Sequence, residues 1–204
     1  MDILLVDPPS KSLQGVVAEF AYPMSLVKLA GYLREGGVDA GILCCDLLTD
    51  IPPSPIWDFD LAAYAEGQRA YARALGPEGH EIWGAIRGAL ERHRPTAVGI
   101  TCLTPSQDAG WKVAAMAKEV DPSVTVVVGG HHATFCPDQT LRQEAVDYVI
   151  RGEGELPLLQ LARQLAAGQV DPVAVPGLSY RTNEGCVHNP PPPLIQDLDA
   201  LPRP

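Results

Sequence analysis

The sequence predicts an α/β domain with a doubly wound, five-stranded parallel sheet of the Rossmann-like or flavodoxin-like type, in strand order 2-1-3-4-5. Two observations predict this fold. Short apolar runs alternate five times with stretches of helical periodicity, and the runs are continuously apolar, as expected for strands buried on both faces. Apolar residues make up 46% of the 204 residues, so the chain can bury a sizeable core.

The first two strands are joined by one helix and followed by an irregular segment. Residues 3–6 form the first strand, and Pro8 and Pro9 end it because proline cannot continue the hydrogen-bond ladder. After a helix, residues 39–45 form the second strand. Residues 50–78 then interrupt the alternation, with prolines followed by a helix rich in alanine and tyrosine. We interpret them as an insertion or lid over one end of the sheet.

The other three strands follow in a regular alternation with helices. They are expected at residues 97–103, 124–128 and 148–150, where β-prone apolar runs end in glycine or threonine. A helical stripe of apolar residues precedes the first of them, and a short helix near residues 139–142 precedes the last. A final helix carries leucines at helical spacing from Leu158 onwards.

The C-terminal part departs from this pattern. Residues 177–188 read as a β-hairpin that should add to an edge of the main sheet or pack against it. Four consecutive prolines at 190–193 then predict an extended linker that projects away as a semi-rigid spacer. We therefore divide the chain into an α/β domain, residues 1–176, and a hairpin with linker, residues 177–204. We expect the linker to lead into a further domain.

The charge of the chain excludes two classes of partner. The formal net charge is −10, whereas nucleic acids and anionic membrane surfaces are bound by basic patches. No apolar run is long enough to span a bilayer, and the first residues do not have the profile of a signal peptide. We expect a cytoplasmic protein with neither a nucleic-acid nor a membrane partner.

The candidate binding residues follow the predicted strands, because ligands of open parallel sheets bind beyond the carboxyl ends of the strands. Neither a G-x-G-x-x-G turn nor a phosphate-binding P-loop is present, which disfavours dinucleotides and P-loop nucleotides. The candidate binding residues by themselves indicate a large, flat ligand with polar edges. The candidates are Asp7, Pro8, Pro9, Thr101, Leu103, Thr104, Gly129, Gly130, His131, Gly152, Glu153, Gly154 and Glu155.

Several of these residues form motifs that resemble a known family. Thr101-x-Leu103 followed by Gly129-Gly130 resembles the Ser/Thr-x-Leu and Gly-Gly pair of cobalamin-binding domains, in which these positions line a slot for the nucleotide tail of the cofactor. Residues 22–33 and 148–155 are similar to segments of cobalamin-dependent radical S-adenosylmethionine (radical SAM) enzymes, which include methyltransferases and anaerobic magnesium-protoporphyrin ester cyclases. The resemblance implies that this domain binds cobalamin.

Two departures from the family patterns refine this expectation. The Asp-x-His-x-x-Gly motif, whose histidine ligates cobalt in methionine-synthase-type domains, is absent after Asp7, so the resemblance implies cobalamin bound base-off and without a histidine from this loop. The Cys-x-x-x-Cys-x-x-Cys motif of radical SAM domains is also absent. A [4Fe–4S] cluster and S-adenosylmethionine are therefore expected only in a downstream domain of the same polypeptide, and this chain alone should be catalytically inactive.

Other interpretations of the residues stay open. The chain could be a free-standing corrinoid carrier or sensor, or a nucleotide- or flavin-binding module of the same fold, since a fold does not fix its ligand. His131 and His132 should make hydrogen bonds or face solvent, and we expect neither to bind a metal. Glu153 and Glu155 fit a helix-capping role as well as a contact with the cofactor. No catalytic residue is expected in this chain.

Overall fold

The computed structural model describes residues 1–15, 17–18, 23–48, 53–54, 61–76, 79–199 and 201–202. Its main sheet has seven strands in the order β3-β1-β5-β6-β7-β8-β9. The first five of these are parallel, which confirms the predicted order 2-1-3-4-5. Their bounds are β1 Ile3–Asp7, β3 Ala40–Cys44, β5 Ala97–Thr101, β6 Thr125–Gly129 and β7 Tyr148–Ile150.

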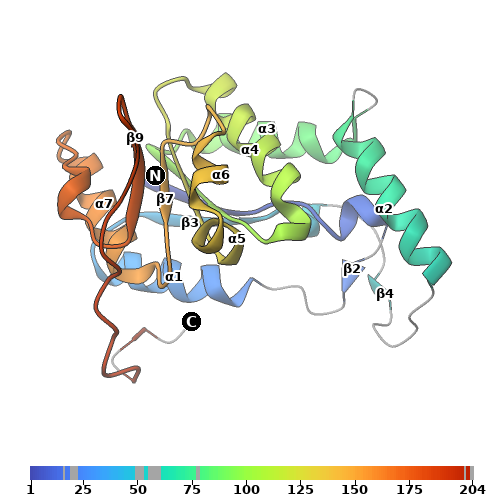
Figure 1. Ribbon diagram of the computed structural model, residues 1–204. Coiled ribbons are helices and arrows are strands. Elements are labelled where there is room, and N and C mark those ends of the chain that lie inside the picture. The colour runs from blue at the N-terminus through green and yellow to red at the C-terminus, as the bar shows by residue number, and fades with distance from the viewer. Residues whose placement is uncertain are drawn as a thin grey trace.

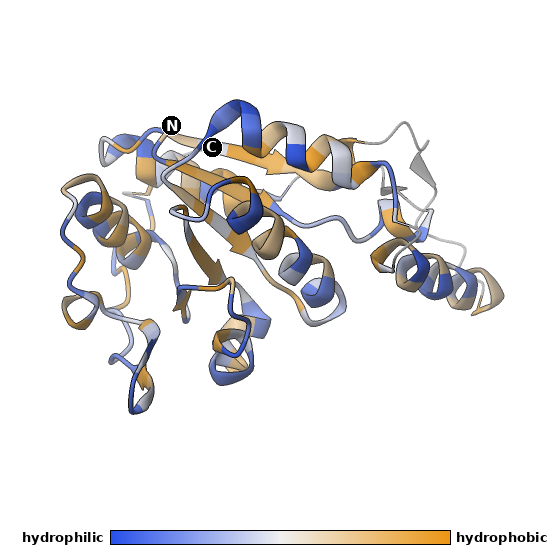
Figure 2. Cartoon of the chain, turned by 90° about the horizontal axis from the view of Figure 1, so that it is seen from above, coloured by the Kyte–Doolittle hydropathy of each residue, from blue (hydrophilic) through white to orange (hydrophobic). Residues whose placement is uncertain are grey.

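Helices cover both faces of the sheet, as the continuous apolar strands predict (Figure 1). On one face α1 (Met24–Glu35) and α7 (Glu155–Ala166) pack over Ile3, Leu5 and Val127. The opposite face carries α3 (Ile82–His93), α4 (Gln107–Val120) and the short helices α5 (His131–Phe135) and α6 (Pro137–Leu141). Figure 2 shows the apolar strands enclosed between helices whose outer faces are hydrophilic.

β5, one of the strands that carry the predicted site, is slightly shorter than the sequence indicates. β5 ends at Thr101, and Thr104 already belongs to a 3₁₀ turn, Thr104–Ser106, that leads into α4. Cys102 continues the pairing by one residue, because its N–H donates to the Gly129 carbonyl oxygen at 2.8 Å. The carboxyl ends of β5 and β6 therefore stay in contact as far as their loops.

The C-terminal hairpin adds to the free edge of β7. It consists of β8 (Leu178–Thr182) and β9 (Gly185–His188), and both pairings are antiparallel. This outcome is one of the two arrangements expected from the sequence. Two reversals of direction make β9 run the same way as β7, so the chain leaves the hairpin at the carboxyl edge of the sheet.

The start of the proline linker is held against the domain, in contrast to the expected projecting spacer. The Gly177 N–H donates to the Pro190 carbonyl oxygen at 2.6 Å, and a Cβ on Gly177 would lie 2.9 Å from Pro192 Cδ. Further along, a Cβ on Gly31 of α1 would lie 3.4 Å from Pro202 Cβ, and Figure 1 shows the tail returning below α1. The linker therefore follows the domain surface at both of these points.

The expected insertion at residues 50–78 is described in part, since residues 50–52, 55–60 and 77–78 lie outside the described ranges. β4 (Pro53–Ser54) pairs with β2 (Val17–Ala18), and α2 (Leu61–Leu75) forms one end of the molecule in Figure 1. Tyr71 anchors α2, because its hydroxyl oxygen accepts the Ala109 N–H at 3.2 Å. Whether this segment acts as a lid stays a prediction. No helix in the described ranges has the length and apolar character needed to cross a bilayer.

Candidate functional site

The candidate site lies where the five parallel strands end. Thr101 pairs with Gly129 across β5 and β6, and Asp7 pairs with Cys44 across β1 and β3. Because side chains alternate along a strand, Asp7, Thr101 and Gly129 fall on the face that α1 and α7 cover. These three residues therefore border one space between the end of the sheet and the two helices.

The two adjacent glycines at the end of β6 have different roles. A Cβ on Gly129 would meet nothing nearer than the Ile150 carbonyl oxygen, at 3.8 Å, so the space beside it is open. Gly130 has φ +95°, and a Cβ there would lie 2.8 Å from the Cys102 carbonyl oxygen and 3.1 Å from Thr101 Oγ1. Gly130 thus allows the backbones of the two loops to touch, whereas Gly129 leaves room for a ligand.

The helical wall of this space contains a carboxylate oxygen without a partner. Gly154, just before α7, faces α1, since its Cβ would lie 3.7 Å from the Leu29 side chain. Glu155 begins α7, and its Oε2 atom is buried with no hydrogen-bond partner among the described residues. Such an atom normally has a partner, so it favours a ligand with polar groups in this space. We call the space between Thr101, Gly129 and Glu155 the slot.

The loop after β1 is fixed by a residue that the sequence analysis missed. Asp46 is only 6% exposed, and its carboxylate accepts hydrogen bonds from the N–H groups of Ser10, Lys11 and Ser12 at 2.9, 3.2 and 3.0 Å. The Ser12 hydroxyl donates a fourth bond at 2.7 Å. Asp46 follows β3, so the strand-end rule that selected the other residues would have found it if applied to the second strand.

Asp7 lies beside this anchor and has a perturbed carboxyl group. Burial, and next the negative charge of Asp46, raise the pKa of Asp7 to about 6. The Cys44 thiol lies 3.9 Å from Asp7 Oδ2 and can donate to it. Burial and the charges of Asp7 and Asp46 raise the pKa of Cys44 to about 11, so this sulfur stays a thiol at neutral pH. The pair offers a neutral or singly charged polar edge to a ligand.

The loops after β5 and β6 are joined by a hydrogen bond between side chains. Thr104 Oγ1 lies 3.2 Å from Nδ1 of His132, a buried ring whose centroid is 6.0 Å from that of Trp111. His131 is exposed at the start of α5, and Leu103 is 48% exposed. Thr104 therefore holds the loop to α5, while Leu103 and His131 face outward beside the slot.

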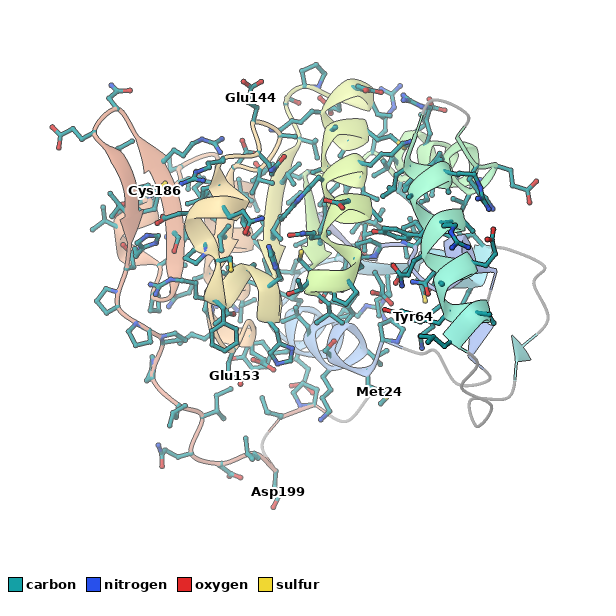
Figure 3. The ribbon with its side chains drawn as sticks, turned by 45° about the vertical axis from the view of Figure 1, so that its right-hand side comes forward. Met24, Tyr64, Glu144, Glu153, Cys186 and Asp199 are labelled. Carbon is teal, nitrogen blue, oxygen red and sulfur yellow. The ribbon has the colours of Figure 1, made fainter. Side chains whose placement is uncertain are left out.

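The loop after β7 separates the two glutamates of the predicted motif. Gly152 has φ +75°, and its N–H donates to Thr134 Oγ1 of α5 at 3.0 Å. Glu153 is exposed on the lower edge of the molecule in Figure 3, the edge on which Met24 also lies. Glu155 turns its buried oxygen inward instead. Contact of these residues with a cofactor stays a prediction.

The predicted site residues thus fall into two groups. Asp7, Thr101, Gly129, Gly154 and Glu155 surround the slot, and Pro8 and Pro9 are buried in the anchored loop beside it. Gly130, Thr104 and Gly152 shape the loops, and Leu103, His131 and Glu153 face outward. Within the ranges described, no three histidine, cysteine or acidic side chains gather closely enough to hold a metal ion.

The comparison with protein families identifies the class of domain. Residues 11–162, three quarters of the chain, match the sequence model of the family described as B12 binding domain. The chain belongs to the B12-binding domain family. This membership assigns cobalamin as the cofactor and confirms the expectation drawn from the motifs. The matched segment contains the ends of β3, β5, β6 and β7, where the slot lies.

Curated relatives are longer proteins. A protein of Pyrococcus horikoshii named as an uncharacterized methyltransferase is 32% identical over 206 residues, which cover 100% of this chain and 38% of that protein. The anaerobic magnesium-protoporphyrin IX monomethyl ester cyclase of Rubrivivax gelatinosus is 29% identical over 205 residues, covering 98% of this chain and 32% of the cyclase. The chain spans about a third of the length of these relatives.

Solved structures share the fold. The radical S-adenosylmethionine methyltransferase TsrM from Kitasatospora setae, with cobalamin and a [4Fe–4S] cluster bound, superposes with a TM-score of 0.66 at 20% identity, covering 99% of this chain and 31% of TsrM. The cobalamin-dependent S-adenosylmethionine radical enzyme OxsB gives a TM-score of 0.67 at 15% identity, covering 95% of this chain and 22% of OxsB.

The residues of the slot fit the assigned cofactor. Cobalamin combines a flat corrin ring, edged by amides, with a nucleotide tail that carries hydroxyl and phosphate groups. The open space beside Gly129 can admit the tail, Thr101 Oγ1 is a polar group at its side, and the unpartnered Oε2 of Glu155 can accept a hydrogen bond from it. The polar side chains that border the slot are one hydroxyl, of Thr101, and the carboxyl groups of Asp7 and Glu155. Such groups can form hydrogen bonds with amides and hydroxyls.

Proposed function

We propose that this chain is the cobalamin-binding domain of a cobalamin-dependent radical SAM enzyme, a methyltransferase or a related enzyme of the cyclase type. The observation that carries the proposal is the open slot at Gly129, bordered by Thr101 and the buried oxygen of Glu155, within a B12-binding family match. A relative from Streptomyces tokunonensis named cobalamin-dependent radical SAM methyltransferase TokK, 31% identical over 111 residues, supports the choice of a radical SAM enzyme over a free-standing corrinoid carrier.

The residues of the chain bind and orient the cofactor and take no part in bond making. Bound cobalamin supplies the group-transfer chemistry of cobalt. Thr101 and Gly129 line the path of the nucleotide tail, Glu155 accepts a hydrogen bond from it, and the loop after β1, fixed by Asp46, supports the corrin side. Iron–sulfur and S-adenosylmethionine chemistry belong to a second domain, which β9 can reach because it delivers the chain to the carboxyl edge.

We also propose that cobalamin is bound base-off and without a histidine from the loop after β1. Residues 7–15 contain no histidine, and Asp46 fixes this loop through four hydrogen bonds. The Co(II) form should therefore show no nitrogen superhyperfine splitting in electron paramagnetic resonance. Splitting that vanishes in His131→Ala or His132→Ala would make one of these residues the ligand and contradict the proposal.

The slot is tested by Gly129→Val. Valine suits a β-strand, and its Cβ meets no atom within 3.7 Å, so the variant should fold, whereas its branched side chain fills the path of the tail. We expect cobalamin retention to be lost, with circular dichroism and thermal unfolding unchanged. Gly41→Val in β3 is the matched control, since its Cβ would lie 2.8 Å from the flexible end of the Met1 side chain and 3.5 Å from Leu4 Cδ1. Full retention by Gly129→Val would show that the slot is misplaced.

An absorption spectrum distinguishes a cobalamin-binding domain from a flavin- or nucleotide-binding module. The purified chain reconstituted with hydroxocobalamin should keep the corrin absorption bands after gel filtration. A chain that excludes cobalamin and retains a flavin or a nucleotide would instead be a binding module of another kind.

A further inference from the structure

Four side chains from different parts of the fold form a continuous row of hydrogen bonds outside the slot. Asp138 of α6 lies 3.0 Å from Nε2 of His188 on β9, through its Oδ1 atom. The other ring nitrogen, Nδ1, lies 2.9 Å from the hydroxyl of Ser179 on β8. That hydroxyl accepts the Nε–H of Arg151 at 2.9 Å. The row crosses the hairpin and ends at the first residue after β7.

The row does not have the properties of a hydrolytic Ser-His-Asp site. Ser179 is 0% exposed, so no substrate reaches its hydroxyl, which already accepts a bond from the Arg151 guanidinium. Geometry of this kind, with a buried hydroxyl between a cation and an imidazole, fixes side chains in place. The row therefore fixes Arg151 at its inner end.

Arg151 connects three segments of the chain. Its backbone N–H donates to the Gly177 carbonyl oxygen at 3.0 Å, and its Nη2 donates to the carbonyl oxygen of Asn189. Asn189 is itself 6% exposed, and its amide donates to the carbonyl oxygens of Pro172 and Val175 at 2.6 and 2.7 Å. Arg151 thus ties the end of β7 to the hairpin and to the residue that precedes the four prolines.

The position of Arg151 relates this cluster to the slot. The next residue, Gly152, opens the loop that leads through Gly154 to Glu155, the residue whose buried Oε2 atom has no hydrogen-bond partner among the described residues. On its other side the loop is held by the Gly152 N–H, which donates to Thr134 Oγ1. Loss of the Arg151 contacts would therefore leave the start of α7 free to shift relative to Thr101 and Gly129.

We propose that Arg151 is a positioning residue for the nucleotide tail of cobalamin, and that the hairpin through Ser179 and His188 is a working part of the cofactor-binding unit. This inference rests on the proposed function. It extends the unit beyond residue 162, where the family match ends. The hydrogen bonds that Arg151 makes with neutral oxygens give its guanidinium a geometry that a lysine cannot reproduce.

The experiment compares two ligands on the full chain. Cobalamin carries the nucleotide tail, whereas cobinamide has the same corrin ring and lacks the tail. Arg151→Gln and Ser179→Ala should weaken cobalamin binding by roughly tenfold to a hundredfold and about threefold to tenfold, and change cobinamide binding by less than about threefold. Arg151→Lys should not restore the parental affinity for cobalamin.

Another arginine, Arg181 on β8, supplies the control for the loss of an arginine side chain. Arg181 donates to the backbone carbonyl oxygens of Leu141, Gln143 and Glu144, at the end of the hairpin away from the slot. Arg181→Gln should therefore leave the affinities for both ligands unchanged. It removes an arginine with several backbone contacts, so it reports the general effect of loosening the hairpin.

The outcomes distinguish this inference from the proposed function. Folded Arg151→Gln with parental cobalamin affinity, or equal losses for cobalamin and cobinamide, would overturn the positioning role while leaving the proposed function intact. If Arg151→Gln does not fold, Ser179→Ala decides by the same comparison, since it removes the two bonds of the Ser179 hydroxyl and leaves the Arg151 bond to Asn189 in place. A parental chain that binds neither ligand would overturn the proposed function, and this inference with it.

Discussion

The two loops that flank the slot are fixed in opposite ways. After β1, one buried anion, Asp46, accepts hydrogen bonds from the backbone N–H groups of residues 10–12 and from one hydroxyl of the loop. After β7, a cation, Arg151, donates to neutral oxygens that belong to the hairpin and to the start of the linker. One loop is gathered around a single acceptor, whereas the other is tied outward to other segments.

This difference separates two kinds of dependence. The loop after β1 depends on one side chain from the turn that follows the neighbouring strand, so its shape should survive any change in the hairpin. The loop after β7 depends on several hydrogen bonds with segments outside the parallel sheet, so its position should follow the hairpin. The slot therefore has one wall that is internally fixed and one wall whose position is set from outside.

The largest expected effect is that of Asp46→Ala. The substitution leaves three loop N–H groups and the Ser12 hydroxyl without their acceptor in a mostly buried place. We expect a loss of about 3 kcal/mol in the free energy of unfolding, measured by urea denaturation. Asp2→Ala, which removes one exposed acceptor of the Asp39 N–H, is the control with a loss below about 1 kcal/mol. Equal losses would mean that Asp46 is no special anchor.

The hairpin side of the comparison is tested by Gly177→Ala. Gly177 has φ +72°, and a Cβ there would lie 2.9 Å from Pro192 Cδ and 3.1 Å from the Arg151 carbonyl oxygen. We expect a loss of about 2 kcal/mol from strain and the close contacts together. Gly168→Ala has φ +68° with open space around it, so its loss, about 1 kcal/mol, measures the strain alone. The two variants should differ in thermal unfolding, and coincident melting curves would argue against the contacts.

Asp7→Asn should show a pH-dependent effect of intermediate size. Burial and the Asp46 charge raise the pKa of Asp7 from 3.8 to about 6, so the folded chain holds this proton more tightly than the unfolded chain. The stability that Asp7 contributes is complete below pH of about 4 and is lost as the pH rises through about 6. Above pH 7 the free energy of unfolding of the variant should exceed that of the parent by about 1–2 kcal/mol, allowing for the solvent that still reaches the carboxyl. Urea denaturation at several pH values measures this difference. A constant difference across this window would contradict the perturbed pKa.

The smallest expected effect is that of Thr134→Val. The substitution removes the acceptor of the Gly152 N–H, but Gly152 is exposed, so water can replace the lost bond. The free energy of unfolding should fall by less than about 1 kcal/mol. Hydrogen exchange at the Gly152 amide should accelerate, since its protection depends on this bond. An unchanged exchange rate would show that Arg151 alone protects the loop.

The sequence predicted the fold better than the details of the site. The strands could be found because residues such as 3–6 and 124–128 are continuously apolar, and the rules for parallel connections fix their order. The strand-end rule located Thr101 and Gly129, which do meet in the structure. Asp46 was missed because the rule was not applied to the second strand.

The role of Arg151 could not be predicted, because its partners are distant in the sequence. Ser179 and Asn189 lie 28 and 38 positions further along the chain, and nothing in the local pattern of either residue indicates a hydrogen bond to an arginine. The two glycines after β6 show the same limit. Because they are adjacent, the sequence suggested the same role for both. The structure shows that Gly130 is in close contact with the neighbouring loop, whereas the space beside Gly129 is open.

The hairpin also offers a place to modify the protein without disturbing its cofactor. Its two strands carry the chain away from the carboxyl edge and back, so the turn at residues 183–184 lies at the opposite edge, toward the end where Figure 3 shows Glu144. The turn is exposed, and local hydrogen bonds of Thr182 close it. A peptide tag or a fluorescent label inserted there would lengthen the hairpin at its far end. The exit of the chain beside the slot would keep its place, so a reporter at this turn could follow the protein without altering what it binds.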